Sequence, residues 1–293
     1  MPVGIIQKGI GGFYYVITPD CVYECKARGV FRKNGMTPLP GDRVVISEID
    51  SDKKTGVITE ILERESELVR PAVANVNQLV AVVAVKSPDP DYYLVDKLLI
   101  TAEYKRMRAL VCVNKIDLDN ENLRYEIRGG YEKAGYKVIF TSSCTGEGFD
   151  QLKEELKDRI SVFAGQSGVG KSTILNKILN SQIMKTGVVS EKIKRGKHTT
   201  RHAEIVKLEQ GGFVVDTPGF SMFEINDIQH KELNLYYPEF NRYPESCKFV
   251  GCSHISEPGC CVKAALGKGL IDPGRYERYV DLYKDLASRK QWD

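Results

Sequence analysis

The feature that most restricts the fold of this 293-residue chain is the glycine-rich segment Gly165–Ser172, whose sequence is GQSGVGKS. An apolar run, Ile160–Ala164, precedes it, and a segment of helical composition, Lys171–Asn180, follows it. Glycines at this spacing let backbone N–H groups surround a phosphate, and the following helix adds the positive end of its dipole. The strand–loop–helix context therefore predicts a phosphate-binding loop inside an α/β domain.

The same segment supplies candidate ligands for the phosphates of a nucleotide and for a magnesium ion. Lys171 is expected to reach the β- and γ-phosphates, where its charge would also support catalysis, and the Ser172 hydroxyl is expected to coordinate Mg²⁺. The other nucleotide contacts that we expect here are Gly165, Gln166, Ser167, Gly168, Val169, Gly170 and Thr173.

A candidate base-recognition motif lies upstream of the phosphate loop. The sequence NKID, which begins at Asn114, follows the apolar run Ala109–Val113. The Asp117 carboxylate can accept hydrogen bonds from the ring N–H and the exocyclic amine of guanine, and adenine offers neither donor at those positions. The stem of Lys115 can cover the base, and Asn114 can tie adjacent loops together. The motif therefore predicts a guanine nucleotide rather than an adenine nucleotide.

Two further segments complete the predicted site. Ser142 and Ser143 follow the apolar run Tyr136–Phe140, and their backbone N–H groups can close the base pocket. Downstream, the sequence DTPG begins at Asp216 and ends at Gly219. The carboxylate of Asp216 can hold Mg²⁺, and the N–H of Gly219 can sense the γ-phosphate because no Cβ blocks its approach.

The order of these motifs along the chain is itself informative. In ordinary GTP-binding proteins the phosphate loop comes first and the guanine-reading NKxD motif comes last. Here the guanine-reading motif precedes the phosphate loop, and DTPG follows both. This order predicts a circularly permuted GTPase domain.

A basic segment, Lys192–His202, lies between the phosphate loop and DTPG and has the position of a nucleotide-dependent switch. Thr200 within it is expected to complete the Mg²⁺ shell when a γ-phosphate is present. Phe220 stands directly after DTPG, where Ras-type enzymes carry a glutamine that orients the attacking water. Because an aromatic ring cannot orient water by hydrogen bonding, another residue must do so.

A cluster of metal-ligand residues lies near the C-terminus, and its members are Cys247, Cys252, His254 and Cys260. Three thiolates and one imidazole suit a closed, tetrahedral, structural Zn²⁺ site, which leaves no open position for catalysis. Cys261 adjoins Cys260 and could replace it as a ligand. A disulfide is the less favoured alternative in a reducing compartment. The remaining cysteines are expected to be ordinary packing residues, namely Cys21, Cys25, Cys112 and Cys144.

The chain divides into three predicted parts, which give a multi-domain fold class. Residues 1–66 have the short aromatic and β-branched runs of an all-β OB barrel, although another small barrel would show the same periodicity. Residues 67–220 alternate apolar runs and helical segments, as in a doubly wound α/β domain, here a circularly permuted GTPase. Residues 221–293 form a mainly helical, zinc-binding part with a helical tail, Arg275–Ser288.

The predicted elements can be given by residue range. Barrel strands are expected at Phe13–Thr18, Asp20–Cys25, Arg43–Ser47 and Gly56–Ile61. Strands of the central domain are expected at Leu79–Val85, Ala109–Val113, Tyr136–Phe140, Ile160–Ala164 and Gly212–Val215. Helices of the central domain are expected at Tyr92–Arg106, Leu123–Ala134, Gly148–Arg159 and Lys171–Asn180.

Composition narrows the choice of partner and compartment. The net charge is only +3, so the chain is no polycation, and any nucleic-acid contact must come from local basic clusters. One such cluster is Lys26, Arg28, Arg32 and Lys33, which could equally be a solvated loop. The longest apolar run is too short to cross a bilayer, and the N-terminus lacks a basic start followed by an apolar core. We expect a cytoplasmic protein with no membrane contact.

These motifs, in this order, resemble the circularly permuted GTPases of the small ribosomal subunit biogenesis (RsgA) family, and the resemblance covers the whole chain. It implies an N-terminal OB fold, hydrolysis of GTP to GDP, and binding to the 30S subunit and its 16S rRNA late in assembly, with stimulation by the subunit. It also implies that His198 orients the water and that Cys260 rather than Cys261 binds zinc. A monomer is expected. His198 could instead contact phosphate or RNA.

Other functions remain possible from the residues. A GTPase of signalling or membrane traffic is disfavoured because the termini carry no lipidation motif. An RNA-binding zinc protein that uses GTP as a structural ligand, without turnover, is kept open by Phe220. An ATPase is the weakest alternative because Asp117 has no use with adenine.

Overall fold

The computed structural model describes residues 2–33, 35–50, 52–69, 71–179, 203–216, 225, 227–243 and 247–289. The chain separates into two compact units. One consists of Met1–Gln78, Lys153–Phe163 and Ser172–Phe220, and the other of Leu79–Leu152, Ala164–Lys171 and Ser221–Asp293.

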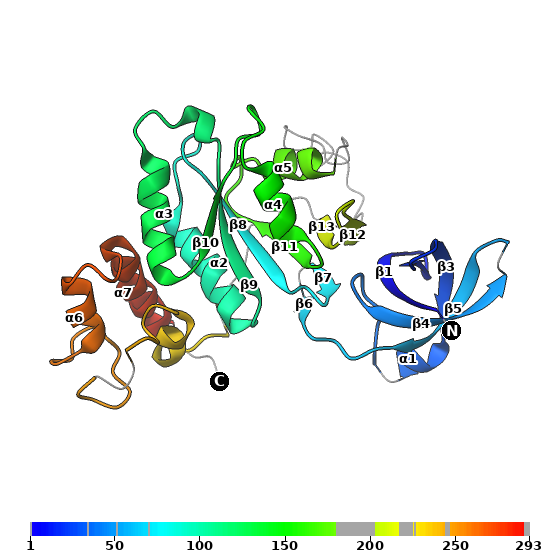
Figure 1. The fold of residues 1–293 in the computed structure, drawn as a ribbon. Coiled ribbons are helices and arrows are strands. Elements are labelled where there is room, and N and C mark those ends of the chain that lie inside the picture. The colour runs from blue at the N-terminus through cyan, green and yellow to red at the C-terminus, as the bar shows by residue number, and fades with distance from the viewer. Residues whose placement is uncertain are drawn as a thin grey trace, which may run out of the picture. The chain divides into compact units, whose positions relative to one another are not determined.

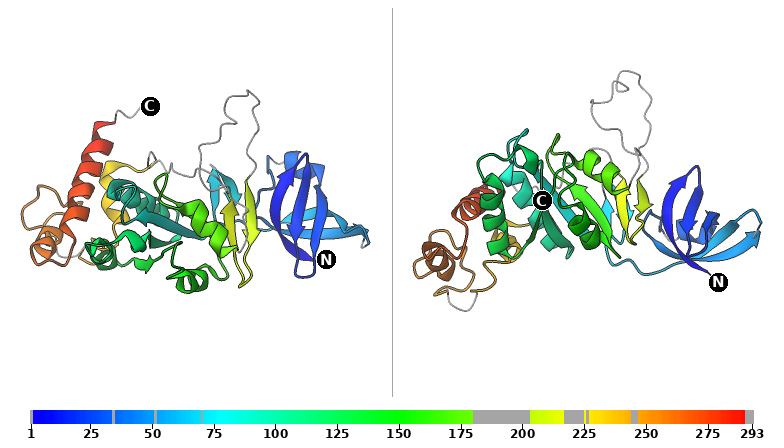
Figure 2. Two further views of the ribbon diagram at one scale, coloured as in Figure 1. Left: turned by 90° about the horizontal axis from the view of Figure 1, so that it is seen from above. Right: turned by 45° about the horizontal axis from the view of Figure 1, so that its top comes forward.

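The N-terminal strands form a closed barrel in the order β1-β2-β3-β5-β4, drawn in blue in Figures 1 and 2. The strands are β1 (Val3–Ile10), β2 (Phe13–Ile17), β3 (Val22–Ala27), β4 (Arg43–Asp50) and β5 (Thr55–Ile61). A short helix, α1 (Gly29–Lys33), follows β3, which pairs in parallel with β5. This strand order with a helix between β3 and β4 is that of an OB fold, so the predicted barrel type is confirmed.

The interior of the barrel is small and apolar. It contains Ile6, Val16, Cys25, Val44, Ile46 and Ile58, all of them fully buried. The basic cluster, for which a solvated loop was the alternative interpretation, belongs to β3 and α1 and to the residue between them, because the chain forms a helical turn there. The Lys26 ammonium lies 5.2 Å from the centre of the Phe13 ring.

The central sheet has six strands in the order β10-β9-β8-β11-β13-β12. They are β8 (Gln78–Ala84), β9 (Arg108–Asn114), β10 (Lys137–Phe140), β11 (Ile160–Ala164), β12 (Glu204–Lys207) and β13 (Phe213–Asp216). The β9–β10 and β11–β13 pairs are parallel, whereas β12 is antiparallel to β13. A small sheet of β6 (Glu67–Val69) and β7 (Ala72–Ala74) precedes β8.

Among the residues that the structure describes, four helices belong to the α/β part, as the alternating pattern predicts. They are α2 (Tyr92–Tyr104), α3 (Leu123–Ala134), α4 (Phe149–Leu156) and α5 (Lys171–Ile178). Helix α2 packs against β9, and α3 packs against both β9 and β10 (Figure 1). Helix α2 ends two residues before the predicted Arg106, because Arg106 has a positive φ of 54° and cannot continue the helix.

The C-terminal region is mainly helical, as predicted. It consists of the 3₁₀ segment η3 (His230–Tyr236), α6 (Cys261–Gly267) and α7 (Pro273–Ser288). Helix α7 begins two residues earlier than predicted, since the Asp272 side chain accepts from Arg275 N at 2.8 Å and Pro273 occupies a first-turn position. The core of the C-terminal region is aromatic. The ring centre of Phe240 lies 5.0 Å from that of Tyr237 and 4.8 Å from that of Tyr279.

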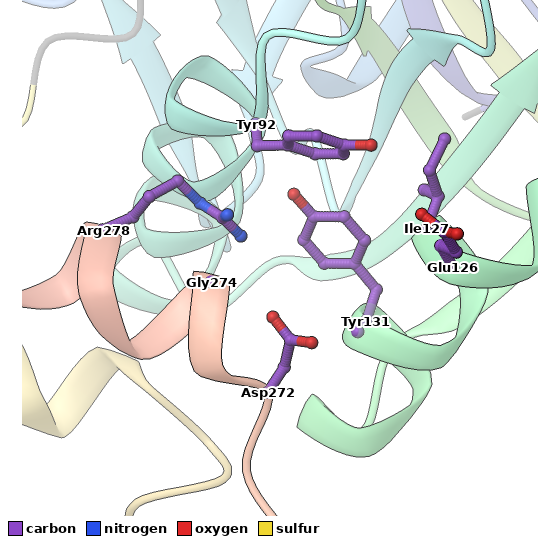
Figure 3. Close-up of a pocket in the computed structure, with 8 residues that line it drawn as sticks. Tyr92, Glu126, Ile127, Tyr131, Asp272, Gly274 and Arg278 are labelled. Atoms are coloured by element: carbon purple, nitrogen blue, oxygen red, sulfur yellow. The ribbon is translucent and has the colours of Figure 1, made fainter. Parts of the chain in front are cut away.

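A buried ion network fixes α7 to α2. The Arg275 guanidinium donates from Nη1 to Asp96 at 2.6 Å and from Nε to Glu239 at 2.5 Å, while Arg278 Nε donates to the other Asp96 oxygen at 2.5 Å. Beside this network lies a pocket of about 180 Å³, and the residues that line it include Arg278, Tyr131 and Tyr92 (Figure 3).

Candidate nucleotide site and metal centre

The loop that is predicted to recognise guanine, which contains Lys115 and Asp117, follows β9 and begins with a strained turn. Lys115 has a left-handed φ of 61°, after which Ile116–Leu118 form a single 3₁₀ turn. This turn leaves the Asp117 side chain exposed, where a base can reach it. The Lys115 ammonium donates to the backbone carbonyl of Ser87. Sequence reasoning missed that partner because nothing marks a backbone carbonyl in a sequence.

The loop after β10 orients the Asp117 carboxylate. The hydroxyl of Ser142 donates to Asp117 Oδ1 at 2.5 Å, and its oxygen accepts from the backbone N–H groups of Cys144 and Thr145 at 3.2 and 3.1 Å. Ser142 is buried, so its orientation is fixed by these bonds rather than by water. The two segments predicted to surround the base therefore do lie together.

Asn114 joins the guanine-reading loop to the phosphate loop. Its amide Nδ2 donates to the carbonyl of Val169 at 2.8 Å, and its Oδ1 accepts from the Thr141 hydroxyl at 3.1 Å. The side chain is 1% exposed, so both bonds lie in the interior, where unpaired polar groups are costly. One side chain thus links the segments predicted to hold the base and the phosphates.

The backbone of the phosphate loop excludes side chains at two glycines. A Cβ on Gly165 would lie 2.1 Å from the Val82 carbonyl oxygen, and one on Gly170 would lie 2.4 Å from Asn114 Nδ2. The φ angles are +149° and +99°, a range that favours glycine. The loop can therefore pass close to β8 and to the guanine-reading loop only because these positions are glycine.

Lys171 has the expected place at the start of α5. Its ammonium donates to the carbonyl oxygens of Gly165 and Gln166 at 2.7 and 2.9 Å. Burial lowers the pKa of Lys171 below its ordinary value. An incoming phosphate would offer this ammonium a charged partner in place of neutral carbonyls, and charge-assisted hydrogen bonds are the stronger ones.

The rest of the predicted nucleotide site is only partly described. Ser172 and Thr173 lie in the first turn of α5, half-buried and exposed respectively, and the backbone of Asp216 ends β13 opposite Glu204. The Asp216 side chain lies outside the described residues. Also outside them are His198, Thr200, Gly219 and Phe220.

The predicted metal ligands converge on one point. The ligand atoms of Cys247, Cys252, His254 and Cys260 all lie within 4.8 Å of one another. His254 Nδ1 is 3.3 Å from Cys260 Sγ and 3.7 Å from Cys247 Sγ. In a tetrahedral site with Zn–S bonds of ~2.3 Å, neighbouring sulfurs are ~3.8 Å apart, so the group fits a zinc ion after a small contraction.

Glu257 shapes the loop that carries these ligands, although it is no ligand itself. Its carboxylate accepts from the N–H and hydroxyl of Ser253, both at 2.7 Å, and from the N–H groups of Ile255 and Ser256 at 3.2 and 3.1 Å. Burial opposes ionisation, but the hydrogen bonds outweigh it and lower the pKa of Glu257 to about 2. A sequence signal for this residue was absent.

The four scattered cysteines behave differently from one another. Cys25 and Cys112 are buried in the barrel and in β9, where burial raises the pKa of their thiols to about 11 and about 12. Cys21 is half-buried. Cys144 is exposed, so its assignment as a packing residue is wrong, because it lies in the turn that Ser142 caps.

Comparisons with known proteins show the family of the chain. The family model for the RsgA GTPase matches residues 61–226, and the model for the RsgA N-terminal domain matches residues 3–58. The small ribosomal subunit biogenesis GTPase RsgA of Ruminiclostridium cellulolyticum is 61% identical over 295 residues, which cover 100% of this chain and 96% of that protein. The chain belongs to the RsgA GTPase family.

Solved structures of the family support the fold over its whole length. The crystal structure of YloQ, a circularly permuted GTPase, matches with a TM-score of 0.84 and 36% identity, covering 100% of this chain and 97% of the other. YjeQ from Thermotoga maritima matches with a TM-score of 0.83 and 37% identity, and 99% of each chain is covered. The permuted order of motifs therefore belongs to the family, and the chain is a GTPase. Among the described residues, no helix is both long and apolar enough to span a membrane.

Proposed function

We propose that this protein hydrolyses GTP to GDP and phosphate while it assists the late assembly of the small (30S) ribosomal subunit, and that the subunit stimulates hydrolysis. The relatives it matches are named for small-subunit biogenesis. The observation that supports nucleotide binding most directly is the Asn114 side chain, which hydrogen-bonds to Val169 of the phosphate loop and to Thr141 beside the base pocket. Ribosome assembly would place the protein in the bacterial cytoplasm.

In the proposed complex, the base is recognised by the loops at the ends of β9 and β10. Asp117, held by Ser142, accepts the two guanine donors, and the Lys115 stem covers the ring. Asn114 fixes the distance between these loops and the phosphate loop. Because adenine has no donors at the two positions where guanine presents them, the carboxylate would be left unpaired, and the site would discriminate against ATP.

The phosphates are expected to lie on the backbone amides of Gly165–Gly170, with Lys171 moving from its loop carbonyls to the β- and γ-phosphates. Further contacts are proposed for Ser143, Thr173 and the N–H of Gly219. Mg²⁺, held by Ser172, Thr200 and Asp216, would neutralise the charge that develops between the β- and γ-phosphates.

His198 is the proposed residue that orients the attacking water. Phe220 occupies the glutamine position of Ras-type enzymes, and it has no hydrogen-bonding group. Replacement of His198 by alanine should abolish most of the subunit-stimulated hydrolysis with little change in GDP affinity. His230→Ala, in η3, is a matched control that should keep the wild-type rate. Unchanged stimulated hydrolysis in His198→Ala would exclude this role.

Contact with the subunit is proposed through 16S rRNA. Lys26, Arg28, Arg32 and Lys33 give the barrel a local excess of positive charge, and such charge binds RNA phosphates. Zn²⁺ in the Cys₃His group would supply the cross-link that holds the C-terminal loop in shape. The protein is proposed to act as a monomer.

Phosphate release measured with 30S subunits, with 50S subunits and with neither tests the proposal. We expect slow basal turnover and at least about tenfold stimulation by 30S alone, since a partner that orders the switch supplies the missing positioning. Equal stimulation by 50S would contradict the proposed partner. A rate that stays at background with 30S would favour an RNA-binding zinc protein that uses GTP as a structural ligand, for which Phe220 is the supporting observation.

A further inference from the structure

A fourth sulfur lies beside the Cys₃His group. Cys261 Sγ is 2.9 Å from Cys247 Sγ, although Cys261 is not one of the four residues whose ligand atoms converge. Its thiol donates to the backbone carbonyl of Tyr243 at 2.7 Å, which directs it away from the centre of the group. A closed tetrahedral site has no place for a fifth donor, so this thiol needs another explanation.

Solvent can reach this thiol. Cys261 lines an open cavity of about 420 Å³ together with Tyr243, Ala264 and Lys268. Cys247 and Cys261 are half-buried, whereas Cys252 and Cys260 are buried. Cys260 also lines this cavity, but it is buried, so a small polar oxidant has better access to the two half-buried cysteines, Cys261 and Cys247.

We propose that Cys247 and Cys261 form an oxidisable pair whose disulfide removes one ligand from the metal centre. Hydrogen peroxide is the oxidant. The Cys261 thiol takes one oxygen atom from peroxide, becomes a sulfenic acid and releases water. The Cys247 thiolate then attacks the Cys261 sulfur, so that an S–S bond forms, the S–O bond breaks and the hydroxide that leaves takes up a proton. Two thiols and one peroxide thus give one disulfide and two waters.

The geometry favours this pair over others in the cluster. A disulfide needs a sulfur separation of ~2.05 Å, so the 2.9 Å separation must shorten by under about 1 Å. The competing products would join Cys261 to the more buried Cys252 or Cys260. Once Cys247 is oxidised, only three donors remain in the group, and a thiolate lost from a structural zinc site weakens its hold on the ion.

The loop would remain attached after the metal leaves, because α7 holds it independently. The hydroxyl of Tyr276 donates to the His254 carbonyl at 2.7 Å, and that of Tyr279 donates to the Ser253 carbonyl at 2.6 Å. Reduction of the disulfide can therefore return Cys247 to a loop whose backbone is still in place. We infer that oxidation and metal loss are reversible, which suits a regulatory thiol pair in a reducing compartment.

The test uses the full-length, metal-loaded protein, and it rests on the proposed zinc occupancy. Hydrogen peroxide is titrated, zinc release is followed with a colorimetric chelator, and disulfides are mapped by mass spectrometry after alkylation. The expected result is a Cys247–Cys261 disulfide that forms in step with zinc release, and rebinding of zinc after reduction. Cys261→Ser, which keeps a donor for the Tyr243 carbonyl, should bind zinc normally and release it at least about tenfold more slowly. Cys21→Ala, in the barrel, should behave as wild type.

Two results would overturn the inference. One is zinc release from Cys261→Ser at the wild-type rate, and the other is a disulfide that joins any other pair of cysteines. The metal content of the untreated protein is measured first. This measurement tests the proposed zinc occupancy independently of the proposed disulfide. Should that protein hold no zinc, the mapped disulfide still decides whether Cys247 and Cys261 are the reactive pair.

Discussion

At the scale of single residues, Gly170 shows how tightly the two halves of the nucleotide site are joined. The change Gly170→Ala would place a Cβ 2.4 Å from Asn114 Nδ2 and would strain a backbone with φ near +99°. We expect the Asn114–Val169 bond to break and the affinity for GDP to fall on the order of 10- to 100-fold, since one buried hydrogen bond with its desolvation is worth about 1–3 kcal/mol. Titration calorimetry measures this directly.

Gly129 provides the matched control. It lies in α3, and a Cβ there would meet nothing within 4 Å. Gly129→Ala should leave GDP affinity unchanged and should raise stability by about 0.5–1 kcal/mol, because alanine loses less entropy in a helix. If both substitutions left GDP affinity at the wild-type level, the hydrogen bond from Asn114 to Val169 would not contribute to nucleotide binding.

The site residues that could be predicted from the sequence are those that would bind a ligand through their side chains. Asp117, Lys171 and the Cys₃His residues are recognisable because their type and spacing suit the ligands that we predict for them. Val82 could not be predicted, since it contributes a backbone carbonyl near Gly165 rather than a side chain. Glu257 could not be predicted either, because its partners include backbone N–H groups, which a sequence does not mark.

At the scale of elements, strands with a continuous apolar run were predicted well, and two strands without such a run were missed. Strand β11 has the predicted bounds, and β8 and β9 differ from theirs by one residue at each end, because each is an apolar run with most of its residues buried. Strand β12 was missed, since Glu204–Lys207 has only two apolar residues, which lie between two charged residues. Strand β1 was missed as well, because glycines and polar residues interrupt its apolar pattern.

The junction of α2 and α7 depends on a buried charge network. Replacement of Arg275 by methionine would leave Asp96 and Glu239 as buried carboxylates, the latter without its cation. We expect a loss of about 3–5 kcal/mol in the free energy of unfolding of the unit that holds both helices, as for other buried pairs that lose one partner. Urea denaturation followed by far-ultraviolet circular dichroism is the measurement.

Arg289→Met is the control for that experiment. Arg289 pairs with Asp285 at 2.8 Å on the surface of the same helix, with both side chains about 40% exposed. Exposed pairs four residues apart contribute about 0.3–0.5 kcal/mol, so the change should be near the limit of detection. Equal losses in the two variants would mean that burial does not strengthen the Arg275 pairs.

At the scale of the whole molecule, loss of the metal is expected to leave nucleotide binding intact. Removal of zinc by a strong chelator should separate the side chains of Cys247, Cys252, His254 and Cys260, because the metal would be what holds them together, while the hydrogen bonds from α7 keep the backbone of the loop attached. Stimulation of hydrolysis by 30S should then be lost, while GDP affinity stays within about threefold. Loss of GDP binding together with zinc would show that the nucleotide site depends on the metal for its fold.

We propose that a circularly permuted site, with Asp117 from the loop after β9 and Lys171 from the start of α5, binds a guanine nucleotide. Titration calorimetry of the wild-type protein with GDP and with ADP tests it most directly. We expect one site for GDP and an affinity for ADP that is weaker on the order of 10³-fold or more, because adenine has no donors at the positions where the Asp117 carboxylate would accept from guanine. Equal affinity for the two nucleotides, or no binding of either, would contradict it.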